Sequence, residues 1–294
     1  MLKIRFGVGL GADTAPAELA EIVEHLEASG VDSLWLSEQV YSSAVEPVVG
    51  LAYALARTRR LKVGTSVAVL PGRHPALVAK QLASLAALAP RRVLPVFGLR
   101  PARSGEVALF AVPEGRRAAV FDESLVLLRR LLTEDEVSFS GEFFTVQGAR
   151  IGPRPARPLD IWLGGSAPAG LRRIGRLGDG WLGSFVTPAE ARAAVDTIRA
   201  AAADAGREIE PDHYGISLVV AGGDLPDALA ATLRQRRPDL DPAELVARDW
   251  PHLHRLLDEY IAAGLSKFVI RTVAGPAPIE FIDRFVTELL PRQN

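Results

Sequence analysis

The feature that most constrains this chain is the alternation of strand patterns with helix patterns along its 294 residues. Short runs rich in branched apolar residues, bounded by Gly, Pro or polar residues, predict strands. These runs lie at residues 4–10, 33–37, 61–70, 92–98, 161–163, 180–183, 214–220 and 267–271. Helix patterns separate them. Residues 16–29 are the clearest case, with apolar side chains at helical spacing.

About eight strand–helix units in a chain of this length predict an α/β fold, a closed (β/α)8 TIM barrel, as a single domain over residues 1–294. The alternation breaks at residues 99–112 and 222–249, so we expect insertions after the fourth and the seventh strand. A doubly wound open sheet is the alternative. It gains little support, because the stretch GVGLG at residues 7–11 lacks the last glycine of a dinucleotide fingerprint.

Composition narrows the classes of function. Hydrophobic residues make up 48% of the chain, charged residues 23%, and the net charge is −1, so there is no basic surface for nucleic acid. Cysteine is absent and no histidine pair has metal-site spacing, so we expect no metal. The first residues enter a strand pattern rather than a signal peptide, and no apolar run approaches the roughly 20 residues that cross a bilayer. We therefore expect a cytoplasmic protein that acts on a small molecule and binds no membrane.

A candidate anion site lies in the stretch LDIWLGGSAPAG at residues 159–170. Its apolar run ends at Gly164 and Gly165, and Ser166 is predicted to be the N-cap of the next helix. The N–H groups of Gly165, Ser166 and Ala167 would then point at an anionic oxygen. An ordinary tight turn between strand and helix has the same signature, so this motif alone leaves both interpretations open.

Three stretches, in order along the chain, resemble the bacterial luciferase-like flavin-dependent monooxygenase superfamily. They are GVDSLWLSEQ at residues 30–39, LKVGTSVAVLPGRHPALVAKQLASL at 61–85 and WLGGSAPAGLRRIGRLGDGW at 162–181. The resemblance covers most of the chain, and the second stretch is the most specific. Within the superfamily, the chain is most similar to the actinobacterial branch of oxidoreductases that use coenzyme F420, a deazaflavin.

The resemblance implies a flavin-type ring over the C-terminal ends of the strands, with a cis peptide bond between Ser66 and Val67 against it. It places the cofactor phosphate where the fifth strand meets its helix and at the start of the sixth strand. It also implies a homodimer. The cofactor-binding residues that it implies are Ser37, Thr65, Ser66, Val67, Gly98, Gly164, Gly165, Ser166, Ala167 and Ser184.

Two acid/base groups of the family are missing. Members often carry an acid followed by His at the end of the second strand, whereas here Glu38 is followed by Gln39, whose amide cannot exchange protons. The glutamate that follows the fourth strand in the related glucose-6-phosphate dehydrogenase is replaced by LRP at residues 99–101. We expect Glu38 and Gln39 to be the candidate catalytic residues. Glu106 lies further along in the loop, where it is expected to be a solvated surface acid; the alternative is that it substitutes for the missing glutamate.

Two arginines, Arg100 and Arg103, follow the fourth strand and offer positive charge for the acidic tail of F420 or for an anionic substrate. The first hypothesis is hydride transfer between F420 and a small organic substrate. The alternative is an FMN-dependent luciferase-like monooxygenase. A cofactor-binding protein without turnover is a hypothesis of another class, and the GGS turn alone would also fit a phosphosugar barrel enzyme.

Overall fold

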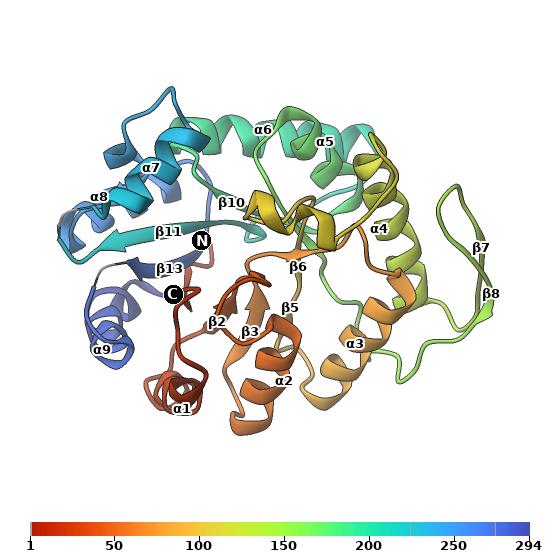
Figure 1. Ribbon diagram of the computed structural model, residues 1–294, viewed down its shortest axis with the longest axis horizontal. Coiled ribbons are helices and arrows are strands. Elements are labelled where there is room, and N and C mark those ends of the chain that lie inside the picture. Colours follow the sequence, from red (N-terminus) through yellow and green to blue (C-terminus); the bar gives the residue numbers. More distant parts are fainter. Residues whose placement is uncertain (1, 224, 274) are drawn as a thin grey trace.

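The structure, a computed structural model, describes residues 2–223, 225–273 and 275–294. Strands form the centre of the molecule and helices surround them (Figure 1). In chain order, the strands of the central sheet that build the barrel are β1 (Arg5–Gly9), β2 (Ser33–Leu36), β3 (Lys62–Thr65), β4 (Ala68–Val69), β5 (Val93–Leu94), β6 (Val96–Gly98), β9 (Trp162–Gly164), β10 (Gly180–Ser184), β11 (Tyr214–Ala221) and β13 (Lys267–Val273).

Parallel pairing runs round the whole ring of strands. β1 pairs with β2 and β13, β2 pairs with β3, β11 pairs with β13 and β10, and β9 pairs with β10 and β6. The third and fourth strands of the ring are each broken in two, yet β3 pairs with β5 and β4 pairs with β6. The sheet therefore closes on itself. This confirms the predicted (β/α)8 barrel and excludes the open sheet.

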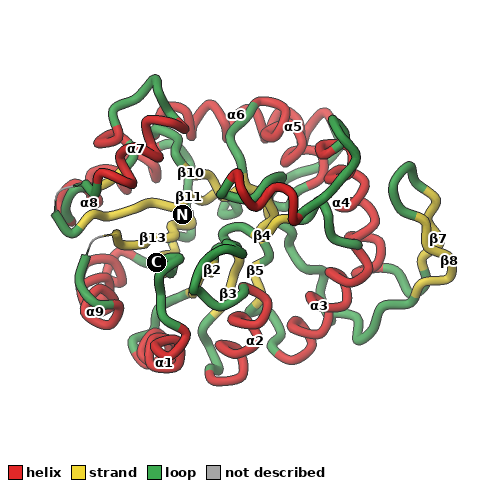
Figure 2. Tube along the Cα trace, viewed as in Figure 1, coloured by secondary structure: helices red, strands yellow, loops and turns green. Residues whose placement is uncertain are grey.

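Helices cover the outside of the barrel (Figure 2). Their apolar faces pack on the outward-facing strand residues to form the main hydrophobic core; Ile22 and Val23, for example, are 1% and 0% exposed. The helices of this layer are α1 (Leu19–Ala28), α2 (Pro47–Arg57), α3 (Pro75–Leu88), α4 (Arg117–Thr133), α5 (Pro168–Leu177), α6 (Pro188–Asp204), α8 (Trp250–Ala262) and α9 (Pro278–Leu289).

Three further segments interrupt the plain alternation. A 3-10 helix, Ser104–Leu109, lies between β6 and α4. The strands β7 (Val137–Ser140) and β8 (Thr145–Ala149) form an antiparallel hairpin that projects from the body (Figure 1). After β11 come α7 (Asp227–Arg236) and β12 (Val246–Ala247), which pairs with β11.

An ion cluster around Asp32 lies at the N-terminal end of the barrel. Lys62 Nζ is 2.8 Å from Asp32 Oδ1, and Lys267 Nζ is in close contact with Oδ2. Burial acts to raise the pKa of Asp32, but the attraction of Lys267 and Lys62 outweighs it and holds this pKa well below its usual range. Burial lowers the pKa of Lys267 to about 8, although the attraction of Asp32 opposes the shift. The fold thus keeps a buried carboxylate charged by pairing it.

Candidate active site

The inside of the barrel is filled by a second, smaller apolar cluster whose buried members are Trp35, Val96, Leu182 and Val269. The Trp35 ring fits because a glycine faces it: a Cβ on Gly64 would lie 2.5 Å from ring carbons. Large and small residues of neighbouring strands interdigitate, so the barrel is a packed core rather than a pore. A ligand is therefore expected above this cluster, at the C-terminal ends of the strands, which we call the mouth.

The break in the third strand forms part of the floor of the mouth. The peptide bond between Ser66 and Val67 is cis, as the family resemblance implied. The Val67 side chain lies against Gly98 at the end of β6 and Gly164 at the end of β9. Ser37, just past β2, donates from its Oγ to the carbonyl oxygen of Ser66 at 2.8 Å. Five residues that were expected to bind the cofactor thus meet at one place.

Thr65, directly before the break, uses its hydroxyl within the barrel. The Oγ1 atom donates to the carbonyl oxygen of Val96 at 2.7 Å and accepts the N–H of Val96 at 2.9 Å. The fourth strand is interrupted at Pro95, which has no N–H to give. Thr65 therefore braces this interruption, and its expected contact with a cofactor stays a prediction.

The carboxylate of Glu38 is 4% exposed and fully engaged. Its Oε2 accepts the N–H of Val69 at 2.7 Å and Nη1 of Arg73 at 2.8 Å, while its Oε1 is in close contact with Nη2 of Arg73. The hydrogen bond to Glu38 raises the pKa of Arg73, and the Arg73 guanidinium stacks 5.1 Å from the Phe110 ring. Both charges are compensated, so this pair fixes the backbone of β4 and is poorly placed to exchange protons.

Gln39 follows Glu38 and is half-buried. Within the described part of the chain, its side-chain amide has no hydrogen-bond partner, whereas its carbonyl oxygen accepts the Oγ of Ser42 at 2.7 Å. An amide can donate and accept hydrogen bonds but cannot take up or release a proton at neutral pH. Gln39 can therefore orient a ligand oxygen or N–H group.

Glu106 corrects one expectation, because it is fully buried rather than solvated. Its Oε1 accepts the N–H of Tyr41 at 2.8 Å, and its Oε2 is buried with no partner. The 3-10 helix Ser104–Leu109 turns this side chain inward against the segment that follows β2. Glu106 therefore links the two loops that border this side of the mouth.

The junction between β9 and α5 forms an open cradle of backbone N–H groups. Gly165 has φ +112° and its neighbours Ser166 and Ala167 are exposed. Among the described residues, no protein group accepts a hydrogen bond from the N–H of these three residues. The Trp181 Nε1 donates to the Gly165 carbonyl oxygen at 2.8 Å and fixes the turn. Free N–H groups at a helix start fit a phosphate group.

The N-cap of α5 is Ala167 rather than the predicted Ser166, and no side chain caps this helix. Pro168 occupies the first helical position, where its missing N–H is no loss. An uncapped helix start of this kind can bind an anionic group. Ser184, at the end of the neighbouring β10, is half-buried and completes the predicted phosphate region.

The two loop arginines differ. Arg103 is exposed and its Nη1 is in close contact with the carbonyl oxygen of Tyr41. Arg100 is exposed and has no hydrogen bond or ion pair with any described residue. Burial lowers the pKa of Arg117, and the positive charge of Arg100 lowers it further. Arg100 is thus the arginine that is free to meet an anionic group.

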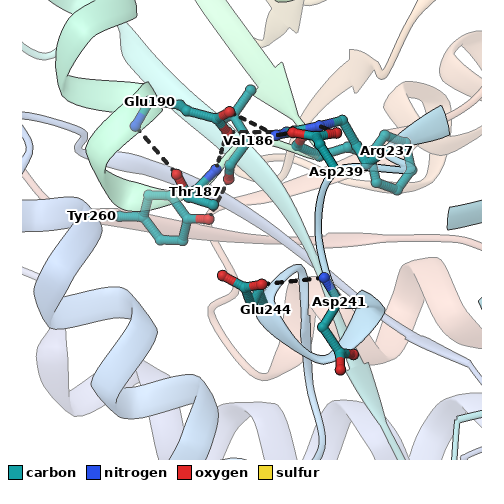
Figure 3. Close-up of polar contacts among 9 residues, drawn as sticks. Val186, Thr187, Glu190, Arg237, Asp239, Asp241, Glu244 and Tyr260 are labelled. Carbon is teal, nitrogen blue, oxygen red and sulfur yellow. Dashed lines mark hydrogen bonds and ion pairs between the residues drawn. The ribbon is translucent and has the colours of Figure 1, made fainter. Parts of the chain in front are cut away.

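A polar network anchors the segment that follows β11 to the residues directly after β10 (Figure 3). Arg237 donates to the carbonyl oxygen of Phe185 at 2.7 Å and pairs with Glu190 at 2.6 Å and Asp239 at 2.7 Å. The hydrogen bonds to Asp239 and Glu190 raise the pKa of Arg237 above its usual value. This network holds the backbone next to Ser184, and the sequence analysis had not identified it.

Two further residues at the mouth were missed, Ser217 on β11 and Arg271 on β13, whose side chains are hydrogen-bonded at 2.6 Å. The alternation of inward and outward side chains along β13 was the signal that could have found Arg271. Elsewhere in the described part of the chain, no group of three acidic, His or Cys side chains is arranged to hold a metal ion. No helix among the described residues is long and apolar enough to span a bilayer.

The sequence profile of luciferase-like monooxygenases matches residues 1–261, so the chain belongs to this family. An F420-dependent glucose-6-phosphate dehydrogenase of Nakamurella multipartita is 36% identical over 192 residues, which are 61% of this chain and 56% of the dehydrogenase. The chain spans about half the length of the curated relatives that it matches.

Solved structures share the whole fold. An F420-dependent secondary alcohol dehydrogenase in complex with an F420–acetone adduct has a TM-score of 0.83 at 18% identity, with 100% of both chains covered. A type II Baeyer–Villiger monooxygenase from Pseudomonas putida in complex with FMN has a TM-score of 0.78 at 14% identity, with 100% of this chain and 99% of that chain covered. At these identities the likeness establishes the fold alone.

Proposed function

We propose that this protein is an oxidoreductase that transfers a hydride between coenzyme F420 and a small organic substrate. The observation that carries the proposal is the open N–H cradle at Gly165, Ser166 and Ala167, which shares a mouth with the broken strand at Ser66 and Val67. The dehydrogenase relative supports F420 as the cofactor, since its name states this dependence.

In this proposal the main role of the chain is to bind and orient the cofactor and the substrate. The cradle and Ser184 hold the phosphate, and Val67, seated on Gly98 and Gly164, supports one side of the ring. Arg100 meets the acidic tail. The cofactor, when bound, supplies the carbon that accepts or donates the hydride.

The remaining groups favour hydride transfer over chemistry that needs a resident acid or base. Glu38 is locked by Arg73 and Val69, and Gln39 can only orient the substrate. A proton that accompanies the hydride would therefore be exchanged with water at the open mouth. The same arrangement favours, as a second candidate, a cofactor-binding protein without turnover.

An FMN-dependent monooxygenase is the other candidate, because the cradle would also accept the phosphate of FMN and an FMN-bound protein shares the fold. The requirement for dioxygen distinguishes the monooxygenase reaction from hydride transfer by F420. We expect reduced F420 to be oxidised by aldehydes, ketones or imines in the absence of dioxygen when the protein is present. Oxidation that needs dioxygen and FMN would support the monooxygenase instead. Binding of F420 without any oxidation across a broad substrate panel would support the protein without turnover.

We also propose that residues 1–294 act as one domain, in the cytoplasm and as a homodimer. The family resemblance supports the dimer, and exposed apolar residues on α2 and α3, Val49 and Leu77 among them, offer a surface for it. Sedimentation equilibrium is the test, with a dimer expected at micromolar concentration. A monomer at every concentration would contradict it.

A further inference from the structure

Arg271 places a positive charge inside the barrel at its mouth. It lies on β13 two residues after Val269, which belongs to the apolar cluster inside the barrel. Side chains alternate along a strand, so Arg271 also points inward, one layer nearer the C-terminal ends. Gly9 on β1 gives independent evidence, since a Cβ there would lie 3.1 Å from Val269 Cγ1 and 3.9 Å from Arg271 Nε.

The contacts of Arg271 leave most of its donors unused. Its Nη2 donates to the Oγ of Ser217 at 2.6 Å, its Nε is buried without a partner, and its Nη1 has no hydrogen bond to any described residue. No carboxylate forms an ion pair with Arg271 in residues 2–223, 225–273 and 275–294. A guanidinium has five N–H donors and stays charged in proteins. The charge is therefore uncompensated by the described protein.

The surroundings make this charge unfavourable for the free protein. Burial lowers the pKa of Arg271, and the like charge of Arg236 lowers it further. Among the described residues, the two cations that are fully buried, Lys267 and Arg173, pair with Asp32 and Asp122, whereas the half-buried Arg271 pairs with no carboxylate. Arg271 is half-buried and its Nε is fully buried without a partner. An unpaired charge in such a place opposes folding, and residues that oppose folding are characteristic of binding sites.

The position of Arg271 in the ring indicates which ligand it meets. Pairing runs from β13 through β11 and β10 to β9 on one side, and through β1 and β2 to β3 on the other. β13 thus stands across the mouth from β6 (Figure 1). β4 and β9 are the neighbours of β6 in the sheet, and these three strands carry the proposed cofactor site. A group that binds between Arg271 and the cofactor is the substrate.

We propose that Arg271, oriented by Ser217, binds an oxyanion of the substrate, so that the substrate is a small organic acid or a phosphate ester. The planar fork of a guanidinium matches carboxylate and phosphate oxygens, and a bound oxyanion supplies the missing countercharge. This inference rests on the proposed function, because it assigns the second ligand of the same mouth. Arg271 is then the residue that selects the substrate class.

The test uses ligands that differ in charge but little in shape. Benzoate and its neutral analogue benzamide are titrated into the F420-bound protein at constant ionic strength, with inorganic phosphate as a separate arm, and Kd is measured by calorimetry. We expect benzoate or phosphate to bind and benzamide not to bind. The arm with the lower Kd distinguishes a carboxylate from a phosphate substrate. In Arg271→Gln we expect the Kd for that anion to rise at least about tenfold.

Two further variants separate a specific contact from general charge or misfolding. Arg271→Lys keeps the charge but loses the fork, and we expect intermediate affinity. Arg236→Gln removes the neighbouring charge and should bind the anion nearly as the wild type does. We also expect ligand-free Arg271→Gln to melt at or above the wild-type temperature. Equal anion affinity in Arg271→Gln, or no anion binding to F420-bound wild type, would overturn the inference.

Titration of wild type with F420 comes first and separates two failures. If F420 does not bind, the proposed function fails, and the benzoate and phosphate titrations on the free protein still decide whether Arg271 is an anion site. If F420 binds and neither anion does, the inference about Arg271 fails alone.

Discussion

The side chain of Val67 lies against Gly98: its Cγ2 atom is 2.6 Å from the point at which a Cβ on Gly98 would sit. On the other side, its Cγ1 is 3.0 Å from the corresponding point on Gly164. Real Cβ atoms are not found so close to a neighbour as the first of these distances, so Val67 can occupy this place only because Gly98 lacks a side chain. Three strands of the barrel thus share one contact beneath the mouth.

Gly98→Ala should displace Val67 from this place. We expect a loss of stability of about 1–3 kcal/mol from overpacking, and weaker binding of F420 because the floor of the mouth moves. Urea unfolding and F420 titration measure the two effects. Gly105→Ala is the control, since a Cβ at Gly105 meets no atom within 4 Å. If Gly98→Ala binds F420 with wild-type affinity, the proposed position of the cofactor ring against Val67 is contradicted.

The cradle is tested at Gly165, whose φ of +112° suits only glycine although the space around it is open. Gly165→Val should turn the N–H groups away from a phosphate and weaken F420 binding at least about tenfold, with strain of about 1–3 kcal/mol. Gly170→Ala, in the first turn of α5 and also in open space, should bind F420 as the wild type does. Equal affinities of the two variants would identify the GGS stretch as a turn without a binding role.

Thr65 should matter for stability more than for binding. Thr65→Val keeps the shape but removes the hydroxyl that bridges the N–H and carbonyl oxygen of Val96. Each of these two buried groups should cost at most about 1–3 kcal/mol of stability when it is left unpaired. If water enters and pairs with them, the total loss should be about 1–3 kcal/mol. Thr145→Val on the exposed hairpin is the control, expected within about 0.5 kcal/mol of wild type. A stable Thr65→Val that no longer binds F420 would show instead that the hydroxyl contacts the cofactor.

The barrel itself could be predicted from sequence, because each strand run is short, apolar and separated from the next by an amphipathic helix. Ser166 was expected to cap α5 on residue preference, but the chain enters the helix one residue later, at Ala167. Glu106 lies in a loop without periodicity, so nothing in its neighbourhood signalled burial. The cis bond between Ser66 and Val67 was predicted from the family resemblance and could not be predicted from periodicity.

Other features of the site depend on contacts between distant strands. The assignment of Gly98 and Gly164 to the cofactor stays a prediction, and the structure adds that the Val67 side chain lies against both and needs Gly98 to lack a side chain. The pairing of Glu38 with Arg73 joins residues 35 positions apart, which a strand pattern cannot predict. Arg271 could have been identified from the sequence, because the alternation of side chains along the strand places it, like Val269, inside the barrel.

The Asp32 cluster predicts a pH dependence of stability. The pKa of Asp32 in the folded protein lies below its ordinary value of 3.8, and the pKa of Lys267 is lowered to about 8. The attraction between them is therefore complete from about pH 4 to about pH 8, and it is lost as the pH falls below about 4. Asp32→Asn should lower the free energy of unfolding by about 3–5 kcal/mol at pH 7, because Lys267 loses its partner. The difference from wild type should shrink below about pH 4.

Urea unfolding of both proteins from pH 7 to pH 3 makes this measurement. Asp135→Asn is the control, because the Asp135 side chain is 88% exposed in its ion pair with Arg154 and should contribute less than about 1 kcal/mol. A difference between wild type and Asp32→Asn that grows toward pH 3 would contradict the assigned charge state of Asp32.

The most direct test of the account is a parallel titration of the cofactor-free protein with F420 and with FMN, followed by fluorescence. The cradle at Gly165, Ser166 and Ala167 accepts either phosphate, while Arg100 offers charge for the longer acidic tail of F420. We predict that F420 binds more tightly than FMN, and that Arg100→Gln narrows the difference between the two Kd values. Micromolar binding of FMN without measurable binding of F420 would contradict the account and identify the protein as an FMN-dependent monooxygenase.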